Sequence, residues 1–266
     1  MSQAESGPST KLSERQAYIN TVIFGASFFL IYTATETARN YLSVMFGRVG
    51  QYYQGSFSVV VGVMGVFAPF FLHYFRLKPS IHLSSILCLI YIGLIMGALF
   101  VWEGVDKEYL PAGALVMGLI GAILYGIGTC IFYVAYSLYM DSITNPKTRG
   151  ILVGVFFGIF NFCAPVGNLL AGILNQTSLN QSIIQLIFAV IAFVGVIVLI
   201  PIKTGEMNED RYLTFKPYFK EMFEIAKIPR YYAVALSSVF NMCMVNFLAS
   251  VFTGQVPEDT ARTFTG

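Results

Sequence analysis

The sequence predicts an all-α, polytopic membrane protein, and two observations lead to this prediction. Apolar residues make up 56% of the 266 residues and charged residues only 11%, whereas soluble proteins carry about 25% charged residues. The charges are also concentrated between long apolar runs, and none of these runs shows the polar–apolar alternation of a β-barrel wall. Because a helix needs about 20 residues to cross a bilayer, the runs are long enough to span it.

The chain divides into a polar N-terminus, six closely spaced apolar runs, a polar linker, a seventh run and a polar tail. The predicted spans are 19–45, 54–75, 81–101, 111–139, 151–174, 182–202 and 230–252. The first six form a bundle (19–202), flanked by the N-terminus (1–18), the linker (203–229) and the tail (253–266). The linker contains an amphipathic stretch, 217–228, which predicts either a helix on the membrane surface or a soluble linker helix.

Prolines and glycines predict details of these spans. Pro69 and Pro165 lie inside the second and fifth spans, where a proline is expected to kink the helix. Small residues recur at intervals that let helix backbones approach closely, so we expect them at helix contacts. They are Gly62 and Gly65, Gly93 and Gly97, and Gly154 and Gly158.

Basic residues predict the orientation, because cytoplasmic loops of membrane proteins are enriched in lysine and arginine. If the N-terminus is cytoplasmic, the inside segments hold twelve basic residues and the outside segments hold three. The twelve are Lys11, Arg15, Arg76, Lys78, Lys147, Arg149, Lys203, Arg211, Lys216, Lys220, Lys227 and Arg230; the three are Arg48, Lys107 and Arg262. This bias predicts a cytoplasmic N-terminus and argues against a seven-span receptor. The net charge of +2 reflects this topology and does not indicate a nucleic-acid partner.

The first span contains two charged residues, Glu36 and Arg39. A spacing of three places both on one face of the helix, where they can pair. Charges at membrane depth normally face a protein interior or a hydrated cavity. Three interpretations stay open: a structural clasp, a place in a ligand pathway, or a shallow position at the membrane interface.

Two further spans carry polar residues on one face. The fourth span carries Tyr125, Thr129, Tyr133 and Tyr136 at steps of four, four and three. The fifth carries Asn161, Pro165 and Asn168 at steps of four and three. One interpretation is that hydrogen bonds between helices satisfy these groups. The other is that both stripes converge with the charged pair of the first span on one polar cavity.

The cytoplasmic end of the fourth span carries Asp141, which is followed by Lys147 and Arg149. We expect Asp141 and Arg149 to form a cytoplasmic gate or a clasp of the loop. Nothing in the sequence indicates catalysis or a cofactor. The histidines lack neighbours at metal-ligand spacing, and neither a phosphate-binding loop nor a nucleophile elbow occurs. The four cysteines all fall within spans, so we expect no disulfide.

The fifth span carries a specific pattern, Gly150-x3-Gly154-x-Phe156-Phe157-x3-Asn161-x5-Gly167-Asn168-Leu169. It resembles the pattern of the Unc-ninety-three-like family, a divergent branch of the major facilitator superfamily, which usually has Trp at the position of Phe157 and Gln at that of Asn161. The first span is also similar, because Tyr32-Thr33-Ala34-Thr35-Glu36-Thr37 follows the family pattern with Glu36 in place of a neutral amide. The fourth span departs from the pattern at Gly128-Thr129, where the family has Gln-Gly.

The resemblance implies a twelve-span fold of two six-helix bundles, of which this chain holds the first bundle and one more helix. A truncated isoform or an incomplete gene model is therefore expected. The basic superfamily motif between the second and third spans is replaced by Arg76-Leu77-Lys78-Pro79, which weakens any claim of ordinary alternating access.

Known members of the family regulate a potassium channel or escort receptors between membranes. Two functions are therefore predicted. One is transmembrane transport of a small solute or ion through the polar cavity. The other is a non-transporting regulatory or escort subunit of another membrane protein. The expected partners are the lipid bilayer, a solute or ion, and a partner membrane protein or a second copy in a homodimer.

Overall fold

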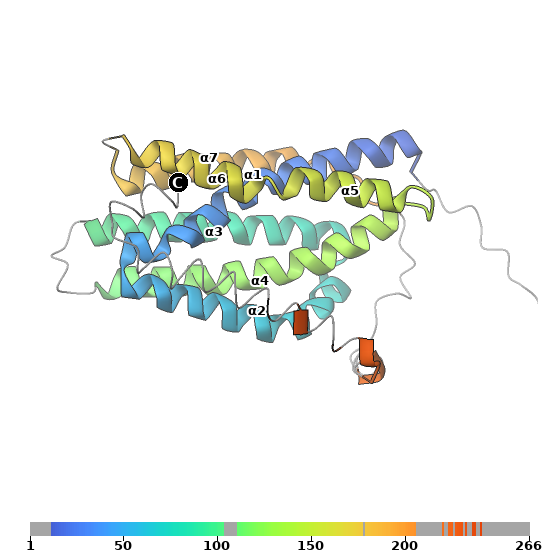
Figure 1. Ribbon diagram of the computed structural model, residues 1–266, viewed down its shortest axis with the longest axis horizontal. Helices are drawn as coiled ribbons and strands as arrows, with labels where there is room; N and C mark the ends of the chain where they lie inside the picture. The colour runs from blue at the N-terminus through green and yellow to red at the C-terminus, as the bar shows by residue number, and fades with distance from the viewer. Residues whose placement is uncertain are drawn as a thin grey trace, which may run out of the picture.

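The computed structural model describes residues 12–103, 111–177 and 179–205, together with residues 220, 223–225, 227–230, 232, 236–237 and 240. The first three ranges hold seven helices and no strand. The helices run side by side along the long axis of the molecule (Figure 1). Their bounds are α1 Glu14–Phe46, α2 Arg48–Phe75, α3 Leu77–Glu103, α4 Ala112–Ile143, α5 Arg149–Phe160, α6 Cys163–Asn175 and α7 Gln181–Leu199.

Five helical stretches are long and apolar enough to cross a membrane. They are α1, α3 as far as Trp102, α4, the pair α5–α6 (Arg149–Asn175) and α7. The predicted all-helical, polytopic membrane fold is therefore confirmed. Helix α2 has 28 residues; it contains the second predicted span (54–75) and begins six residues before it. The tail (253–266) and most of the predicted seventh span (230–252) lie outside the described residues, and half of the amphipathic linker stretch (217–228) does.

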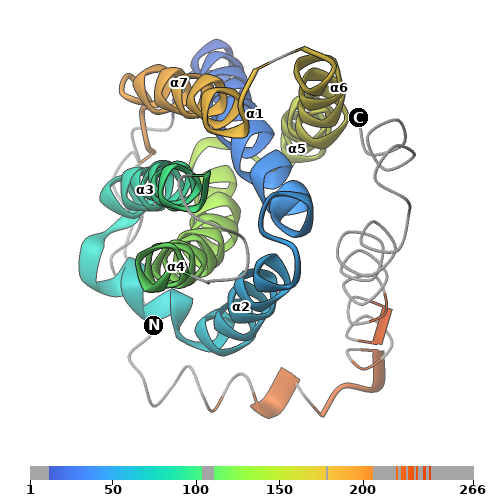
Figure 2. The same ribbon diagram turned by 90° about the vertical axis from the view of Figure 1, so that its left-hand side faces the viewer.

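Helix α1 is the central helix of the bundle. It packs against α2, α3, α5, α6 and α7, and Figure 2 shows α5 and α6 on one side of it and α3 and α4 on the other. Of the residues in its apolar window, 61% are buried, against 28% for the α5–α6 pair. Because neighbouring helices surround α1, it can hold polar and charged side chains that a lipid-facing helix could not.

Single residues join the first three helices. Gly47 connects α1 to α2 with a φ of +56°, and Arg76 connects α2 to α3 with a φ of +60°. This left-handed conformation is costly for most residues and free for glycine. At the second turn the Arg76 N–H donates to the Leu72 carbonyl at 2.9 Å, which caps α2. Each turn reverses the chain within one residue, so consecutive helices run antiparallel.

The fifth predicted span is interrupted in the structure. Helix α5 ends at Phe160 and α6 begins at Cys163, with Asn161 and Phe162 in a turn between them. The sequence predicts a kink from Pro165, and the turn lies four residues earlier because Pro165 has no N–H to donate to the Asn161 carbonyl. The Phe162 N–H instead donates to the Ile159 carbonyl, three residues back, at 3.3 Å.

The prediction that the paired glycines of the second, third and fifth spans lie at helix contacts is largely wrong within this bundle. A Cβ added at five of the six glycines would meet nothing within 4 Å among the described atoms, Gly97 being the exception. Spacing alone does not reveal which side of an apolar helix is buried. Close contacts between helices instead lie at glycines of α2, α4, α6 and α7: Gly50, Gly118, Gly126, Gly128, Gly167 and Gly195.

Candidate functional site

Glu36 and Arg39 form an ion pair on α1. The Arg39 Nη2 atom lies 2.5 Å from Glu36 Oε2, and the two side chains are 13% and 16% exposed respectively. Their positions one helical turn apart allow this geometry without any distortion of the helix. The spacing in the sequence predicts this pair, and the structure contains it.

Tyr125 of α4 binds the other carboxylate oxygen. Its hydroxyl donates a hydrogen bond to Glu36 Oε1 at 2.6 Å. Hydrogen bonds to an ionised carboxylate are short and about twice as strong as those between neutral groups. Each oxygen of Glu36 therefore has a partner, and the carboxylate ties α1 to α4.

A stack of three aromatic rings from three helices lies beside the pair. Phe57 of α2 stacks on Tyr125 at 4.7 Å, and Tyr91 of α3 stacks on Tyr125 at 4.6 Å, measured between ring centroids. The Arg39 guanidinium carbon lies 5.2 Å from the Phe57 centroid, within the range of a cation–π interaction. Helices α1 to α4 thus all contribute to one cluster. We call Glu36, Arg39, Phe57, Tyr91 and Tyr125 the charge cluster.

Sequence reasoning missed Phe57 and Tyr91. Aromatic residues are common in every apolar run of this chain, which has 24 Phe and 16 Tyr residues. Nothing in the spacing distinguishes a ring that stacks in the charge cluster from one that faces lipid. Phe57 and Tyr91 are identified only by their stacking on Tyr125, which depends on how α2, α3 and α4 pack.

Several buried polar atoms in this part of the bundle lack a hydrogen-bond partner among the described residues. They include Arg39 Nε, the Tyr91 hydroxyl, Thr129 Oγ1 and both amide atoms of Gln54. Gln54 is 3% exposed and Thr129 is 5% exposed. A buried polar group without a partner costs about 1–3 kcal/mol. These atoms are the ones that could bind a small polar ligand.

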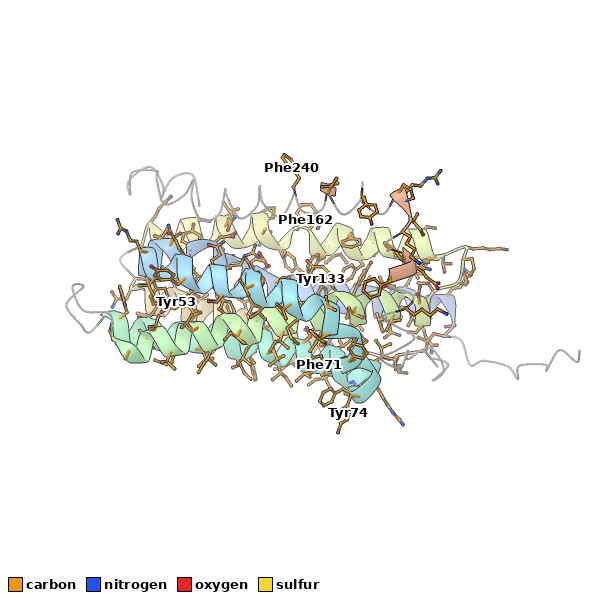
Figure 3. The ribbon with its side chains drawn as sticks, turned by 90° about the horizontal axis from the view of Figure 1, so that it is seen from below. Tyr53, Phe71, Tyr74, Tyr133, Phe162 and Phe240 are labelled. Carbon is orange, nitrogen blue, oxygen red and sulfur yellow. The ribbon has the colours of Figure 1, made fainter. Side chains whose placement is uncertain are left out.

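Among the described residues, no hydrogen bond joins Tyr133, Asn161 or Asn168 to the charge cluster. Tyr133 is 49% exposed, near the middle of the molecule's length (Figure 3). Asn161 is exposed in the turn between α5 and α6. The Oδ1 atom of Asn168, which is half-buried, accepts a hydrogen bond from Asn40 Nδ2 of α1 at 3.5 Å. Convergence of all three polar faces on one cavity therefore stays a prediction.

A group of phenylalanines lies next to the charge cluster, towards the N-terminal end of α1. Phe24 and Phe28 of α1 contact Phe132 of α4 and Phe156 of α5, with centroid distances of 4.2 Å for Phe28–Phe132 and 5.3 Å for Phe24–Phe156. Phe160 adds a further contact at 5.7 Å to Phe132. We call these five residues the aromatic plug. It fills the space between α1, α4 and α5 with apolar rings.

Asp141 and Arg149 form an ion pair across the loop between α4 and α5. The Arg149 Nη2 atom lies 2.7 Å from Asp141 Oδ1. Within the loop, Asn145 Oδ1 accepts hydrogen bonds from the N–H groups of Lys147 and Thr148. The pair joins two consecutive helices, which fits a clasp of the loop, and its role as a gate stays a prediction.

Replacement of Asp141 by asparagine is expected to change stability little. The Arg149 side chain is 55% exposed, and ion pairs at such exposure contribute about 0–1 kcal/mol. The free energy of unfolding, measured in bicelles, should fall by less than about 1 kcal/mol. Asn145→Ala serves as the control, because it removes the two backbone caps of the same loop. A larger loss for Asp141→Asn than for Asn145→Ala would contradict the exposed-clasp description.

A family model described as "Ion channel regulatory protein UNC-93" matches residues 112–258, which is more than half of the 266 residues. The chain belongs to the UNC-93 family. The UNC-93 match begins at α4 and includes Tyr125, Thr129 and Tyr133, while Glu36 and Arg39 precede it. No curated protein and no solved structure was found to match the chain.

The described residues of this UNC-93 family member contain no cluster of metal-ligating side chains. Among the described residues, no group of three or more His, Cys, Asp and Glu side chains lies close enough to hold a metal ion. The chemistry available to the charge cluster is hydrogen bonding and ion pairing, supplied by one carboxylate, one guanidinium and two phenols.

Proposed function

We propose that this chain is a non-transporting regulatory or escort subunit of another membrane protein, in the first place an ion channel. The description of the UNC-93 family, which names ion channel regulation, supports this proposal. The main structural support is that both carboxylate oxygens of Glu36 already have partners, Arg39 and Tyr125. A carboxylate held in this way stabilises the bundle and offers no free charge to a passing solute.

The aromatic plug supports the same proposal. It lies beside the charge cluster, and Phe24, Phe28 and Phe132 are each at most 1% exposed. A pathway through the bundle would have to displace these rings, at a cost of about 0.5–1.5 kcal/mol for each aromatic pair beyond the lost burial. A regulatory subunit needs no such pathway.

Transport of a small solute or ion is the second candidate. The polar atoms of Arg39, Gln54 and Tyr91 that lack a described partner favour it, because a ligand could satisfy them. We also infer a cytoplasmic N-terminus from the twelve-to-three distribution of basic residues. The resemblance to the major facilitator superfamily leads us to propose its six-helix N-terminal bundle for residues 19–202. No enzymatic role is proposed.

Two measurements test the proposal: channel currents in oocytes that express the chain, and ion flux from liposomes that contain the purified chain. In oocytes that express a panel of potassium channels, co-expression of the chain should change the current of at least one channel by about twofold or more, as a stabilising contact of ~0.4 kcal/mol or more would. Liposomes that contain the chain alone should release potassium and protons no faster than empty liposomes. Glu36→Gln should reach the membrane and retain the effect on current.

The opposite pattern would contradict the regulatory proposal. Potassium or proton flux from the chain alone, abolished by Glu36→Gln but preserved by Glu14→Gln, the same chemical change at an exposed carboxylate of α1, would assign Glu36 to a pathway. A chain that changes no channel current and carries no flux would exclude both candidates for the ions tested.

A further inference from the structure

The connection between α2 and α3 contains a residue in an unusual backbone conformation. Arg76 alone joins the two helices, and among the described residues it is the one residue other than glycine with a positive φ, +60°. Glycine adopts this conformation freely, whereas arginine adopts it at a cost in backbone strain. Residues held in this way are concentrated at ligand sites and switch regions. Arg76 is therefore a candidate for a role that depends on its side chain.

The residues beside Arg76 are basic or aromatic, and they are exposed. Arg76 and Lys78 are both exposed, while Tyr74 is 82% and Phe75 42% exposed. Tyr74 is the most exposed large apolar side chain of the described residues, and Figure 3 shows it projecting from the bundle. The rings of Tyr74 and Phe75 lie edge to face, with centroids 5.2 Å apart. We call Tyr74, Phe75, Arg76 and Lys78 the basic–aromatic corner.

The corner carries positive charge on helices that have no acidic residue near it. No Asp or Glu occurs in the sequence between Glu36 and Glu103, a stretch that contains all of α2 and all of α3 except its last residue. Asp141, at the end of α4, is already paired with Arg149. The charge of the corner is therefore complementary to an anionic partner.

The corner lies where the surface of a membrane is expected. Helices α2 and α3 have 28 and 27 residues, so each is about 40 Å long, against about 30 Å for the hydrocarbon core of a bilayer. Because one residue joins them, their shared end reaches beyond the hydrocarbon into the headgroup layer. Tyrosine is enriched in this layer. Lysine and arginine at this depth attract the anionic lipids of the cytoplasmic leaflet, which is the leaflet that the inferred orientation gives to this end.

We propose that the basic–aromatic corner binds the headgroup of an anionic phospholipid. The Arg76 guanidinium and the Lys78 ammonium contact the anionic groups of the headgroup, and the ring of Tyr74 lies at the level of the glycerol. A guanidinium can donate two parallel hydrogen bonds to one phosphate. A tyrosine ring has an apolar body and a polar tip, which suits the boundary between acyl chains and headgroups. The strain at Arg76 is then offset by a contact that glycine could not make.

The test measures the binding of tritiated phosphatidylserine to the purified, affinity-tagged chain in detergent by scintillation proximity, with unlabelled lipids as competitors. Phosphatidylserine should compete about fivefold better, or more, than phosphatidylcholine with the same acyl chains. Arg76→Gln and Lys78→Gln should each weaken phosphatidylserine binding by about fivefold, the contribution of one basic residue at a lipid surface, and leave phosphatidylcholine binding unchanged. Lys78→Arg keeps the charge and should retain the preference. Tyr74→Ala should weaken the binding of both lipids alike, because the ring does not distinguish headgroup charge.

Lys147→Gln is the matched control. Lys147 is an exposed lysine of the loop between α4 and α5, and its replacement should leave phosphatidylserine binding within about twofold. Equal binding of the two lipids by the wild-type chain would overturn the proposal, as would an equal effect of Lys147→Gln and Lys78→Gln. Displacement of phosphatidylserine by millimolar inorganic phosphate at constant ionic strength would assign the corner to a free anion and would overturn it too. Should Arg76→Gln fail to fold, as judged by circular dichroism and size exclusion, Lys78→Gln alone decides. No channel is present, so the result is independent of the proposed function.

Discussion

Gly167→Leu is expected to prevent the bundle from folding. Gly167 of α6 packs directly on α1, where a Cβ would collide with Thr37 Oγ1 and lie 2.8 Å from the Thr33 carbonyl oxygen. Backbone atoms of the central helix cannot move aside without displacing its other contacts. Overpacking costs about 1–3 kcal/mol and occasionally more, and a collision with the backbone of α1 places this variant at the upper end, which is a large part of the stability of most proteins.

The free energy of unfolding, measured by steric trapping in bicelles, checks this expectation. The matched control is Gly158→Leu on α5, where an added Cβ meets nothing within 4 Å. The control should be neutral or slightly stabilising, because leucine is a better helix former than glycine by about 0.5–1 kcal/mol. Equal losses in the two variants would show that α6 does not pack on α1 as described.

Glu36→Leu should be the most damaging substitution in the charge cluster. It leaves the guanidinium of Arg39, which is 13% exposed, without its counter-charge. It also removes the acceptor of the Tyr125 hydroxyl. Loss of one partner of a buried ion pair costs about 3–5 kcal/mol, because the other charge stays buried and unpaired.

Glu36→Gln separates the charge from the hydrogen bond. The amide oxygen can still accept from Tyr125, so we expect a loss of about 1–3 kcal/mol, smaller than that of Glu36→Leu. The same bicelle measurement applies. Equal losses for Gln and Leu would mean that the hydrogen bond contributes nothing, and no loss for either would place Glu36 in water rather than in the bundle.

The helical elements follow from composition to a large extent. Uninterrupted apolar runs long enough to span a bilayer predict helices, and α3 and α7 lie within four residues of the predicted bounds at each end. The sequence predicts a kink at Pro165, whereas the helix breaks at Asn161 and Phe162. A proline perturbs the carbonyl four residues before it, so the break appears one turn upstream of Pro165.

The candidate site is predictable only in part. Glu36 and Arg39 stand out because charge is rare in an apolar run, and their spacing predicts the ion pair that forms. Tyr91 and Phe57 join them through contacts between helices, which no local pattern encodes. The glycine contacts fail for the same reason, since Gly167 and Gly154 look alike in the sequence and face opposite environments in the fold.

A double-mutant cycle on the unfolding free energy tests most directly whether Glu36 and Arg39 serve as a closed clasp. The cycle compares Glu36→Leu, Arg39→Leu and the double variant in bicelles. A clasp predicts that each single change costs about 3–5 kcal/mol while the double change costs less than about 2 kcal/mol, because no unpaired charge is left inside the bundle. Losses that simply add would mean that the two side chains act independently, each with its own partner or with water.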